Sequence, residues 1–404
     1  MAKKLPELLS RGGFHLTKWV SNSAVVIDSI PESERAGGVK DLNFSQPTIQ
    51  RALGKHWDVV TDEFTFKVTI KEKPLTRRGL LSIVSSIYDP LGLVAPFVLP
   101  AKILLQELCR DNLSWDDPIT ERHLMHWSVW IGELPKIQNF RVSRCIKPAT
   151  LKEIASSQLH TFADASERGY GAVSYIRFED MIGKIHCSFM IAKSRVAPPK
   201  TTTIPRMELS VAVCAARLDK LVRKESDLDL KSSFLWTDST CVLGYLSNTT
   251  KRYQTFVANR VATIRETTES AQWRYVPSDQ NPADDVSRGL SADALLNCER
   301  WVNGPQFLWR PDDCWPTQLP TTLTMNDDDP ELKYDVQNFS VNRQSDITMD
   351  EIIKRFSSWQ RLKRFIAWML RYRTALIRRT NVKGYGNTSP GSSIPCIAPL
   401  TVDE

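Results

Sequence analysis

The stretch TFADASERGYGAV (residues 161–173) carries the pattern from which the fold can be worked out. An apolar run ends at a lone carboxylate, Asp164, and a polar turn then leads through Gly169 and Gly171 into a second apolar run. This pattern predicts two β-strands joined by a hairpin that the glycines help to close. A hairpin does not require Asp164, so the carboxylate needs an explanation of its own.

The segments after this hairpin complete an α/β domain over residues 155–290. A third β-rich run, KIHCSFMIA, comes next, and an apolar stripe predicts a helix from about Pro205 to Lys224. The short run SSFLWTD is typical of a strand that is buried on both faces. Two helices, a last strand at QWRYVP and a short helix in NPADDVSR follow. We therefore predict a mixed sheet, antiparallel at its start and flanked by helices.

Four carboxylates lie at strand ends and helix starts, which are the places where α/β sheets bind ligands and carry catalytic residues. Asp164 ends the first strand, Glu208 falls in the first turn of the first helix, Asp238 ends the buried strand, and Asp284 opens the last helix. Carboxylates that converge repel one another unless cations lie among them. Two Mg²⁺ or Mn²⁺ ions held in this way activate water for phosphodiester hydrolysis. The positions therefore predict a metal-dependent nuclease site.

Each carboxylate also has an ordinary explanation when it is taken alone. Asp164 could cap its own turn, Glu208 could complement the helix dipole, and Asp238 could be the N-cap of the next helix. Asp284 and its neighbour Asp285 could both be first-turn acids, and the spacing in N-P-A-D favours Asp284 as the ligand. The metal-site interpretation depends on all four residues occurring in this order on these elements.

The motifs around these residues resemble the ribonuclease H of retroelements. They are Asp164-Ala165-Ser166, Arg206-Met207-Glu208-Leu209, Thr237-Asp238-Ser239 and Asn281-Pro282-Ala283-Asp284. The wider chain resembles the Pol polyprotein of BEL/Pao-type retrotransposons, through stretches such as LLSIVSSIYDPLGLVAPFVLPAKILLQELC and NGPQFLWRPDDCWP. This resemblance implies a ribonuclease H-like fold that cuts the RNA strand of RNA–DNA hybrids, with two Mg²⁺ or Mn²⁺ ions on Asp164, Glu208, Asp238 and Asp284.

The resemblance also implies how the rest of the chain is organised. Residues 1–150 would be the C-terminal remnant of a reverse transcriptase, comprising the end of the palm and the thumb or connection. Residues 291–345 would be a Trp- and Pro-rich loop with an acidic linker, and residues 346–404 a basic helical segment before an integrase, with a flexible tail. The partners would be the hybrid substrate and the remaining Pol polyprotein, with reverse transcriptase upstream and integrase downstream.

Two departures from the family pattern bear on activity. The Y/F-x-D-D hairpin of the polymerase is absent from the sequence, so we expect no polymerase activity from this chain alone. Tyr275 stands where the family often has a histidine, and we expect this change to affect turnover more than metal binding.

Composition narrows the setting in which the protein works. The 53 Lys and Arg residues outnumber the 46 Asp and Glu residues, for a net charge of +7, which favours an anionic partner. The 8 cysteines show no CxxC spacing, which argues against disulfides and structural zinc. The most apolar segment, residues 80–105, contains a charge and three prolines, and no signal peptide opens the chain. These features predict an intracellular protein without a membrane span, in a cytoplasmic particle, the nucleus or both.

Two other functions fit parts of the sequence. A degenerate or domesticated copy would bind nucleic acid or protein without cutting. The basic, aromatic run over residues 352–380 could hold nucleic acid, although its amphipathic spacing favours a packed helical face with a solvated basic side. Elements of this group also carry an aspartic peptidase (A17) name. Asp28-Ser29-Ile30 and Asp238-Ser239-Thr240 both lack the glycine of the peptidase motif, so we expect no peptidase activity.

Overall fold

The computed structural model describes residues 4–36, 49–52, 55–148, 150–200, 202–318, 329–333, 353, 356 and 358–382. The chain divides into two compact units, Met1–Tyr334 and Asp335–Glu404, which are described separately. The helices are α1 (Lys4–Ser10), α2 (Ala24–Asp28), α3 (Arg77–Ser86), α4 (Ala95–Arg110), α5 (Glu121–Glu133), α6 (Ile204–Glu225), α7 (Thr240–Ser247), α8 (Thr255–Arg265), α9 (Ala283–Arg288), α10 (Ala292–Leu296), α11 (Glu299–Asn303) and α13 (Trp359–Val382). The strands are β1 (Ile49–Ala52), β2 (Lys55–Asp58), β3 (Glu63–Thr65), β4 (Val142–Ser143), β5 (Ile154–Ala165), β6 (Gly169–Asp180), β7 (Ile185–Val196), β8 (Ser232–Thr237) and β9 (Trp273–Tyr275).

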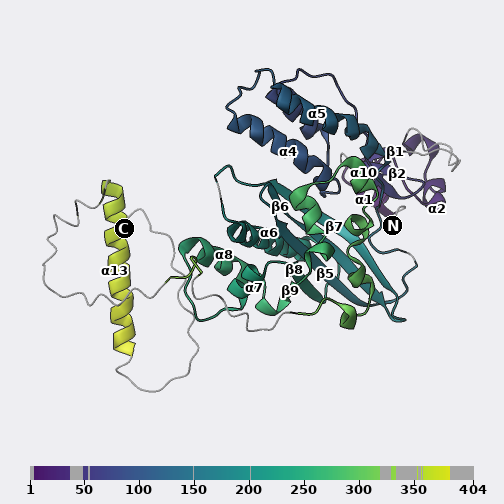
Figure 1. Cartoon of the computed structure of the whole chain (residues 1–404). Helices are drawn as coiled ribbons and strands as arrows, with labels where there is room; N and C mark the ends of the chain where they lie inside the picture. Colours follow the sequence, from purple (N-terminus) through teal and green to yellow (C-terminus); the bar gives the residue numbers. More distant parts are fainter. Residues whose placement is uncertain are drawn as a thin grey trace, which may run out of the picture. The chain divides into compact units, whose positions relative to one another are not determined.

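The larger sheet of the first unit has the strand order β7-β6-β5-β8-β9 (Figure 1). Strands β5, β6 and β7 pair antiparallel, whereas β8 pairs parallel with β5 and β9 pairs parallel with β8. The antiparallel part follows from short hairpin connections, and the parallel part follows from the helical crossover through α6. The predicted mixed α/β sheet is therefore confirmed.

The two faces of this sheet bury different cores, because successive residues of a strand point to opposite sides. On one face, Ala163 of β5 and Leu235 of β8 pack with the apolar residues of α6, α7 and α8. On the other face, Phe162 and Trp236 stack on each other with ring centroids 5.9 Å apart, within a core that also takes residues from α4 and α9. Helices thus cover both faces, as predicted.

The Trp- and Pro-rich segment over residues 301–316 packs against the second face of the sheet. It contains part of α11 and two 3-10 turns, Gln306–Trp309 and Asp312–Cys314. Trp301 is fully buried and donates its indole N–H to the carbonyl oxygen of Leu93, 2.7 Å away. Residues that precede the main sheet in the chain and residues that follow it therefore share one core.

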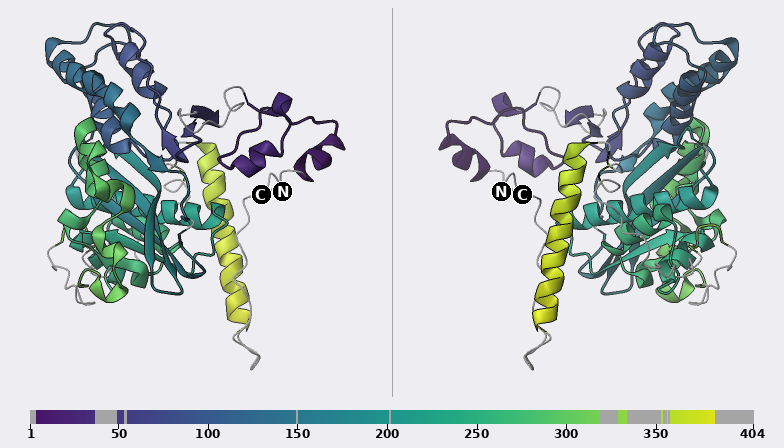
Figure 2. Two further views of the ribbon diagram at one scale, coloured as in Figure 1. Left: turned by 90° about the vertical axis from the view of Figure 1, so that its right-hand side faces the viewer. Right: turned by 90° about the vertical axis from the view of Figure 1, so that its left-hand side faces the viewer.

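A second, smaller sheet precedes the main one, with the order β1-β2-β3-β4. Strands β2 and β3 of this sheet form an antiparallel hairpin, and β3 ends at Thr65. The helices α4 and α5 (blue in Figures 1 and 2) lie side by side, and the indole N–H of Trp130 donates to the carbonyl oxygen of Phe97, 2.9 Å away. The identification of this region as a reverse transcriptase remnant stays a prediction.

The segment Asp89-Pro90-Leu91-Gly92 lies between α3 and α4, and Gly92 has a backbone conformation that only glycine adopts readily. Gly92 has φ +77°, and a Cβ there would lie 2.2 Å from the carbonyl oxygen of Ala192. We expect Gly92→Ala to lower the free energy of unfolding by roughly 2–4 kcal/mol, through backbone strain and this clash. Gly183 has φ +79°, but a Cβ on it would meet nothing within 4 Å, so Gly183→Ala is the matched control. Urea denaturation that shows equal losses for both variants would contradict the role of the clash.

The second unit contains α13, whose sequence is basic and aromatic as predicted for residues 352–380. Trp359 and Tyr372 are each 68% exposed, so neither ring is packed within the described part of the chain. Most of the predicted acidic linker and the tail after Val382 lie outside the described residues. Among the described helices, none combines the length and the apolar character that crossing a lipid bilayer requires.

Candidate metal-binding active site

Two neighbouring parallel strands position the first and third predicted carboxylates. Asp164 lies near the end of β5, and Asp238 directly follows β8. Ala163 and Thr237 are partners in the parallel register. The residues that follow them, Asp164 in β5 and Asp238 after β8, therefore lie at the same edge of the sheet, where both strands end. Adjacent strands lie about 4.8 Å apart, so this register brings the two carboxylates into the same neighbourhood.

Glu208 reaches toward this edge from α6. The helix begins at Ile204 and has no acid in its first turn, so the prediction that Glu208 lies in the first turn is wrong. Position in the second turn weakens its pairing with the helix dipole, which decays within the first turn. The hydroxyl of Ser239 donates to Oε2 of Glu208, 2.5 Å away. That bond ties Glu208 to the residue next to Asp238.

Asp238 does not cap the helix that follows it. The N-cap of α7 is Ser239, whose side chain accepts from the backbone N–H of Val242 at 3.2 Å. Oδ2 of Asp238 instead accepts a hydrogen bond from the hydroxyl of Ser278 at 2.6 Å. The helix-cap explanation for Asp238 is therefore wrong, and its carboxylate stays at the strand edge.

Asp284 lies in the first turn of α9, and a buried asparagine fixes that helix to the sheet. The side-chain N–H of Asn281 donates to the carbonyl oxygen of Ala163 at 3.1 Å, and its Oδ1 accepts from the backbone N–H of Ala283. Arg288, one turn later in α9, donates to Oδ1 of Asp284. Asn281 therefore anchors the start of α9 to the end of β5, next to Asp164.

The neighbouring Asp285 has a different environment. It is 4% exposed, and Nη2 of Arg300 donates to its Oδ1 at 2.7 Å. Because this buried carboxylate already has a cationic partner in α11, Asp285 is better explained as a structural ion pair than as a metal ligand. The geometry thus supports the preference for Asp284.

A glycine in β6 lets α9 pack closely against the sheet. Gly171 is the register partner of Asp164, and a Cβ on it would lie 2.6 Å from Cγ2 of Val286 in α9. The sequence pattern assigns Gly169 and Gly171 the role of closing a hairpin. Gly169 has this role, since its carbonyl oxygen accepts from the backbone N–H of Ser166 at 2.8 Å, but Gly171 lies inside β6 and leaves the space into which the helix packs.

The charges of these residues interact. The pKa of Asp164 is raised to about 7, first by burial and then by the nearby charges of Asp238 and Asp284, while Ser287 and Arg288 oppose the shift. The pKa of Glu208 is also raised, by burial and by Asp238. The pKa of Arg288 is raised by its bond to Asp284, and further by Asp164 and Asp238. The four predicted carboxylates thus form one electrostatic cluster, with Arg288 as its cation.

The donor chemistry of this cluster suits a hard divalent cation. Each carboxylate is bonded to a serine or arginine of the protein: Ser287 with Asp164, Ser239 with Glu208, Ser278 with Asp238, and Arg288 with Asp284. Across the described residues, no set of three or more His, Cys, Asp or Glu side chains lies close enough together to hold a metal ion in this arrangement. Carboxylate oxygens are the donors that Mg²⁺ or Mn²⁺ prefers.

Several residues of the cluster are not among the predicted site residues. Ser239 and Asn281 are inside the quoted motifs and could have been found there. Ser287 and Arg288 follow Asp284 by one helical turn, a spacing that puts them on its face of α9. Ser278 has no local signal, because its contact with Asp238 joins two separate loops.

The strand order and the flanking helices define a ribonuclease H-like α/β domain. Residues 76–239 match one family model, described as the Pao retrotransposon-like RNaseH-like domain. This segment of the chain is therefore similar to the domain of that retrotransposon family. The matched segment contains α3, α4 and α5 as well as Asp164, Glu208 and Asp238, and it ends before Asp284. No curated protein sequence matches the chain.

Solved structures give further similarities. RNase H1 from the archaeon Halobacterium salinarum NRC-1 is 14% identical with a TM-score of 0.23, covering 31% of this chain and 90% of that chain. LC11-RNase H1 in complex with an RNA/DNA hybrid is 15% identical with a TM-score of 0.24, covering 32% of this chain and 93% of that chain. The foamy viral protease-reverse transcriptase dRH in complex with double-stranded DNA is 15% identical with a TM-score of 0.33, covering 56% of this chain and 37% of that chain.

The raised pKa of Asp164 predicts that the metal-free chain loses stability as the pH rises. The carboxyl pKa is about 7 in the folded chain, above its ordinary value of 3.8. Between these pH values the folded chain holds a proton that the unfolded chain has released, so the free energy of unfolding falls with rising pH. We expect Asp164→Asn to remove this slope and to stabilise the metal-free chain at pH 8 on the order of 2 kcal/mol.

Urea denaturation in a chelator at several pH values measures this effect. The difference between wild type and Asp164→Asn isolates this carboxyl from Glu208, whose pKa is shifted in the same direction. A difference in stability that stays the same from pH 5 to pH 8 would contradict the burial and repulsion assigned to Asp164.

Proposed function

We propose that this chain cuts the RNA strand of RNA–DNA hybrids by metal-dependent hydrolysis, as the ribonuclease H domain of a retrotransposon Pol polyprotein. The observation that carries this proposal is the placement of Asp164 and Asp238 at one edge of a ribonuclease H-like sheet, where their charges act on each other. A site with this much unbalanced negative charge calls for divalent cations.

In this proposal, Asp164, Glu208, Asp238 and Asp284 hold two Mg²⁺ or Mn²⁺ ions. When bound, such ions activate a water molecule and stabilise the leaving 3′ oxygen of a phosphodiester. The side chains must be ionised to bind cations, so Asp164 releases its proton and metal affinity rises with pH up to about 7. Ser239, Ser278 and Ser287 hold the carboxylates at the sheet edge before metal arrives.

The proposed substrate is recognised by its shape and not by its sequence. A ribonuclease selects RNA through 2′-hydroxyls that are exposed in a shallow minor groove. The proposal also keeps the predicted context: reverse transcriptase upstream, integrase downstream, no polymerase activity from this chain alone, and an intracellular location in a particle or the nucleus. Tyr275 pairs in register with Thr237, so the position where the family often has histidine lies at the same sheet edge as Asp238.

The test is a cleavage assay on the whole chain with a labelled RNA–DNA hybrid, duplex DNA and single-stranded RNA. We expect Mg²⁺ or Mn²⁺ to support cleavage of the RNA in the hybrid alone, with 3′-hydroxyl ends, and a chelator to stop it. Calorimetric titration with each ion, without nucleic acid, reports metal binding separately. If neither ion binds and the hybrid stays intact, the chain is better described as a binding module that has lost its nuclease.

A further inference from the structure

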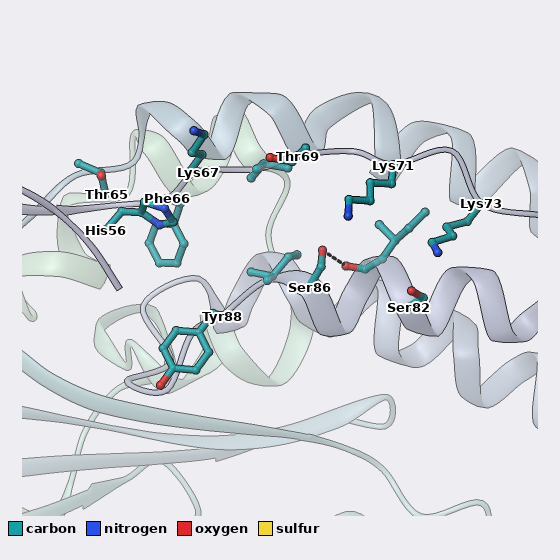
Figure 3. A pocket seen from close by; sticks show the side chains of 13 residues that line it. His56, Thr65, Phe66, Lys67, Thr69, Lys71, Lys73, Ser82, Ser86 and Tyr88 are labelled. Atoms are coloured by element: carbon teal, nitrogen blue, oxygen red, sulfur yellow. Dashed lines mark hydrogen bonds between the residues drawn. The ribbon is translucent and has the colours of Figure 1, made fainter. Parts of the chain in front are cut away.

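A groove lies between the segment after β3 and the helix α3, in the part of the molecule that precedes the ribonuclease H-like sheet. Its volume is about 640 Å³, within the range of small-molecule and nucleotide sites. Figure 3 shows the segment over residues 65–73 along one side and α3 along the other. No carboxylate is among the residues that line it. We call it the lysine groove.

One wall of the lysine groove is cationic. Lys67, Thr69, Lys71 and Lys73 follow one another along it at every second residue, and Figure 3 shows the amines of Lys71 and Lys73 pointing toward α3. Among the described residues, none of the three lysines forms an ion pair. Glu72, between two of them, is not part of the lining. The positive charge of this wall is therefore available to a ligand.

The other wall offers hydroxyls and apolar surface. Ser82, Ile83 and Ser86 come from α3, and the hydroxyl of Ser86 is bonded to the carbonyl oxygen of Ile83 at 2.7 Å. Tyr88 follows the helix with its side chain 51% exposed. Its ring lies beyond the end of α3, at the other end of the groove from Lys71 and Lys73 (Figure 3). An exposed ring offers a stacking surface for a base, and the lysines offer cations for a phosphate backbone.

The helix that lines the groove packs against the ribonuclease H-like sheet. The residues of α3 that face away from it, Leu80 and Val84, are buried in the core shared with the sheet. Just after Tyr88, the carbonyl oxygen of Leu91 accepts from the backbone N–H of Ala192 in β7, 2.8 Å away. A ligand in the groove would therefore be held by the same unit that carries the carboxylate cluster.

We propose that the lysine groove binds a single strand of nucleic acid. A polyanion fits three lysines that form no ion pair among the described residues, in a lining that contains no acid. The volume of about 640 Å³ is of the size that small ligands occupy, which favours a few nucleotides of one strand. This binding goes beyond the proposed cleavage, because it needs neither metal nor a hybrid.

Fluorescence anisotropy with the whole chain in a chelator tests the proposal, using labelled oligo(dT) and oligo(rU) of about 15 nucleotides. The first variant replaces Lys67, Lys71 and Lys73 with glutamine. The matched control replaces the exposed Lys184, Lys220 and Lys224, which makes the same change in net charge. Tyr88→Leu tests stacking. Circular dichroism and thermal melts confirm that every variant is folded.

We expect the groove variant to bind at least about tenfold more weakly at low salt and its log–log salt slope to fall by about 2, as for three lost phosphate contacts. Tyr88→Leu is expected to weaken binding at least about fivefold, and the control less than about twofold. Equal weakening in groove and control variants, wild-type affinity in the groove variant, no binding by wild type, or tighter binding of a duplex of the same length would each overturn the proposal. Because no metal is present, a failed nuclease assay leaves this test intact.

Discussion

Asp238→Asn is expected to reduce metal-dependent cleavage of an RNA–DNA hybrid by about 10³-fold or more. The substitution keeps the size of the side chain and its contact with Ser278, but it removes a charged ligand where several kcal/mol of charge stabilisation is needed. Single-turnover cleavage rates in Mg²⁺ and in Mn²⁺ measure the loss. The thermal melt of the metal-free variant should match or exceed that of wild type, since one repulsive charge is gone.

The adjacent acids of α9 supply a matched pair of controls for this result. Asp284→Asn should lose activity to a similar degree, because Asp284 acts on Asp164. Asp285→Asn should keep the cleavage chemistry and lose stability instead, because it removes the buried carboxylate that pairs with Arg300. A fully active Asp238→Asn variant, or loss of cleavage with Asp285→Asn but not with Asp284→Asn, would contradict the assignment of the ligands.

Arg177→Met is expected to lower the free energy of unfolding by about 3–5 kcal/mol, the cost typical of a broken buried charge network. Arg177 in β6 is 1% exposed, and its guanidinium joins the sheet to the segment over residues 305–315. It donates to the carbonyl oxygens of Leu308 at 2.9 Å and Arg310 at 3.1 Å, and to Gln158 at 3.1 Å. A methionine would fill the space but leave these buried acceptors without a donor.

Urea denaturation of the whole chain measures this loss. Arg310→Met is the matched control, because Arg310 is exposed and contributes its backbone carbonyl to the network. We expect the control to change stability by less than about 0.5 kcal/mol. A loss below about 1 kcal/mol for Arg177→Met would show that the segment over residues 305–315 is held to the sheet mainly by its apolar contacts.

Much of the sheet and the positions of the carboxylates could be predicted because they depend on local patterns. The alternation of apolar and polar residues in β5 and β6, the apolar run of β8 and the apolar stripe of α6 each specify an element from residues close together in the sequence. Motif order then predicts which strand ends carry Asp164 and Asp238. The sequence pattern predicts that α6 starts at about Pro205, whereas the helix begins at Ile204. Helix ends depend on capping contacts and are predicted only to within one or two residues.

The sequence by itself determined the α/β order of the elements and the presence of acids at strand and helix ends. The tertiary structure alone decided that Asp285 of α9 is buried in an ion pair with Arg300, because this contact joins two separate helices. It also decided that Gly171 makes room for α9, and that Arg177 ties residues 305–315 to the sheet. Such contacts join residues far apart in the chain, and local periodicity carries no information about them.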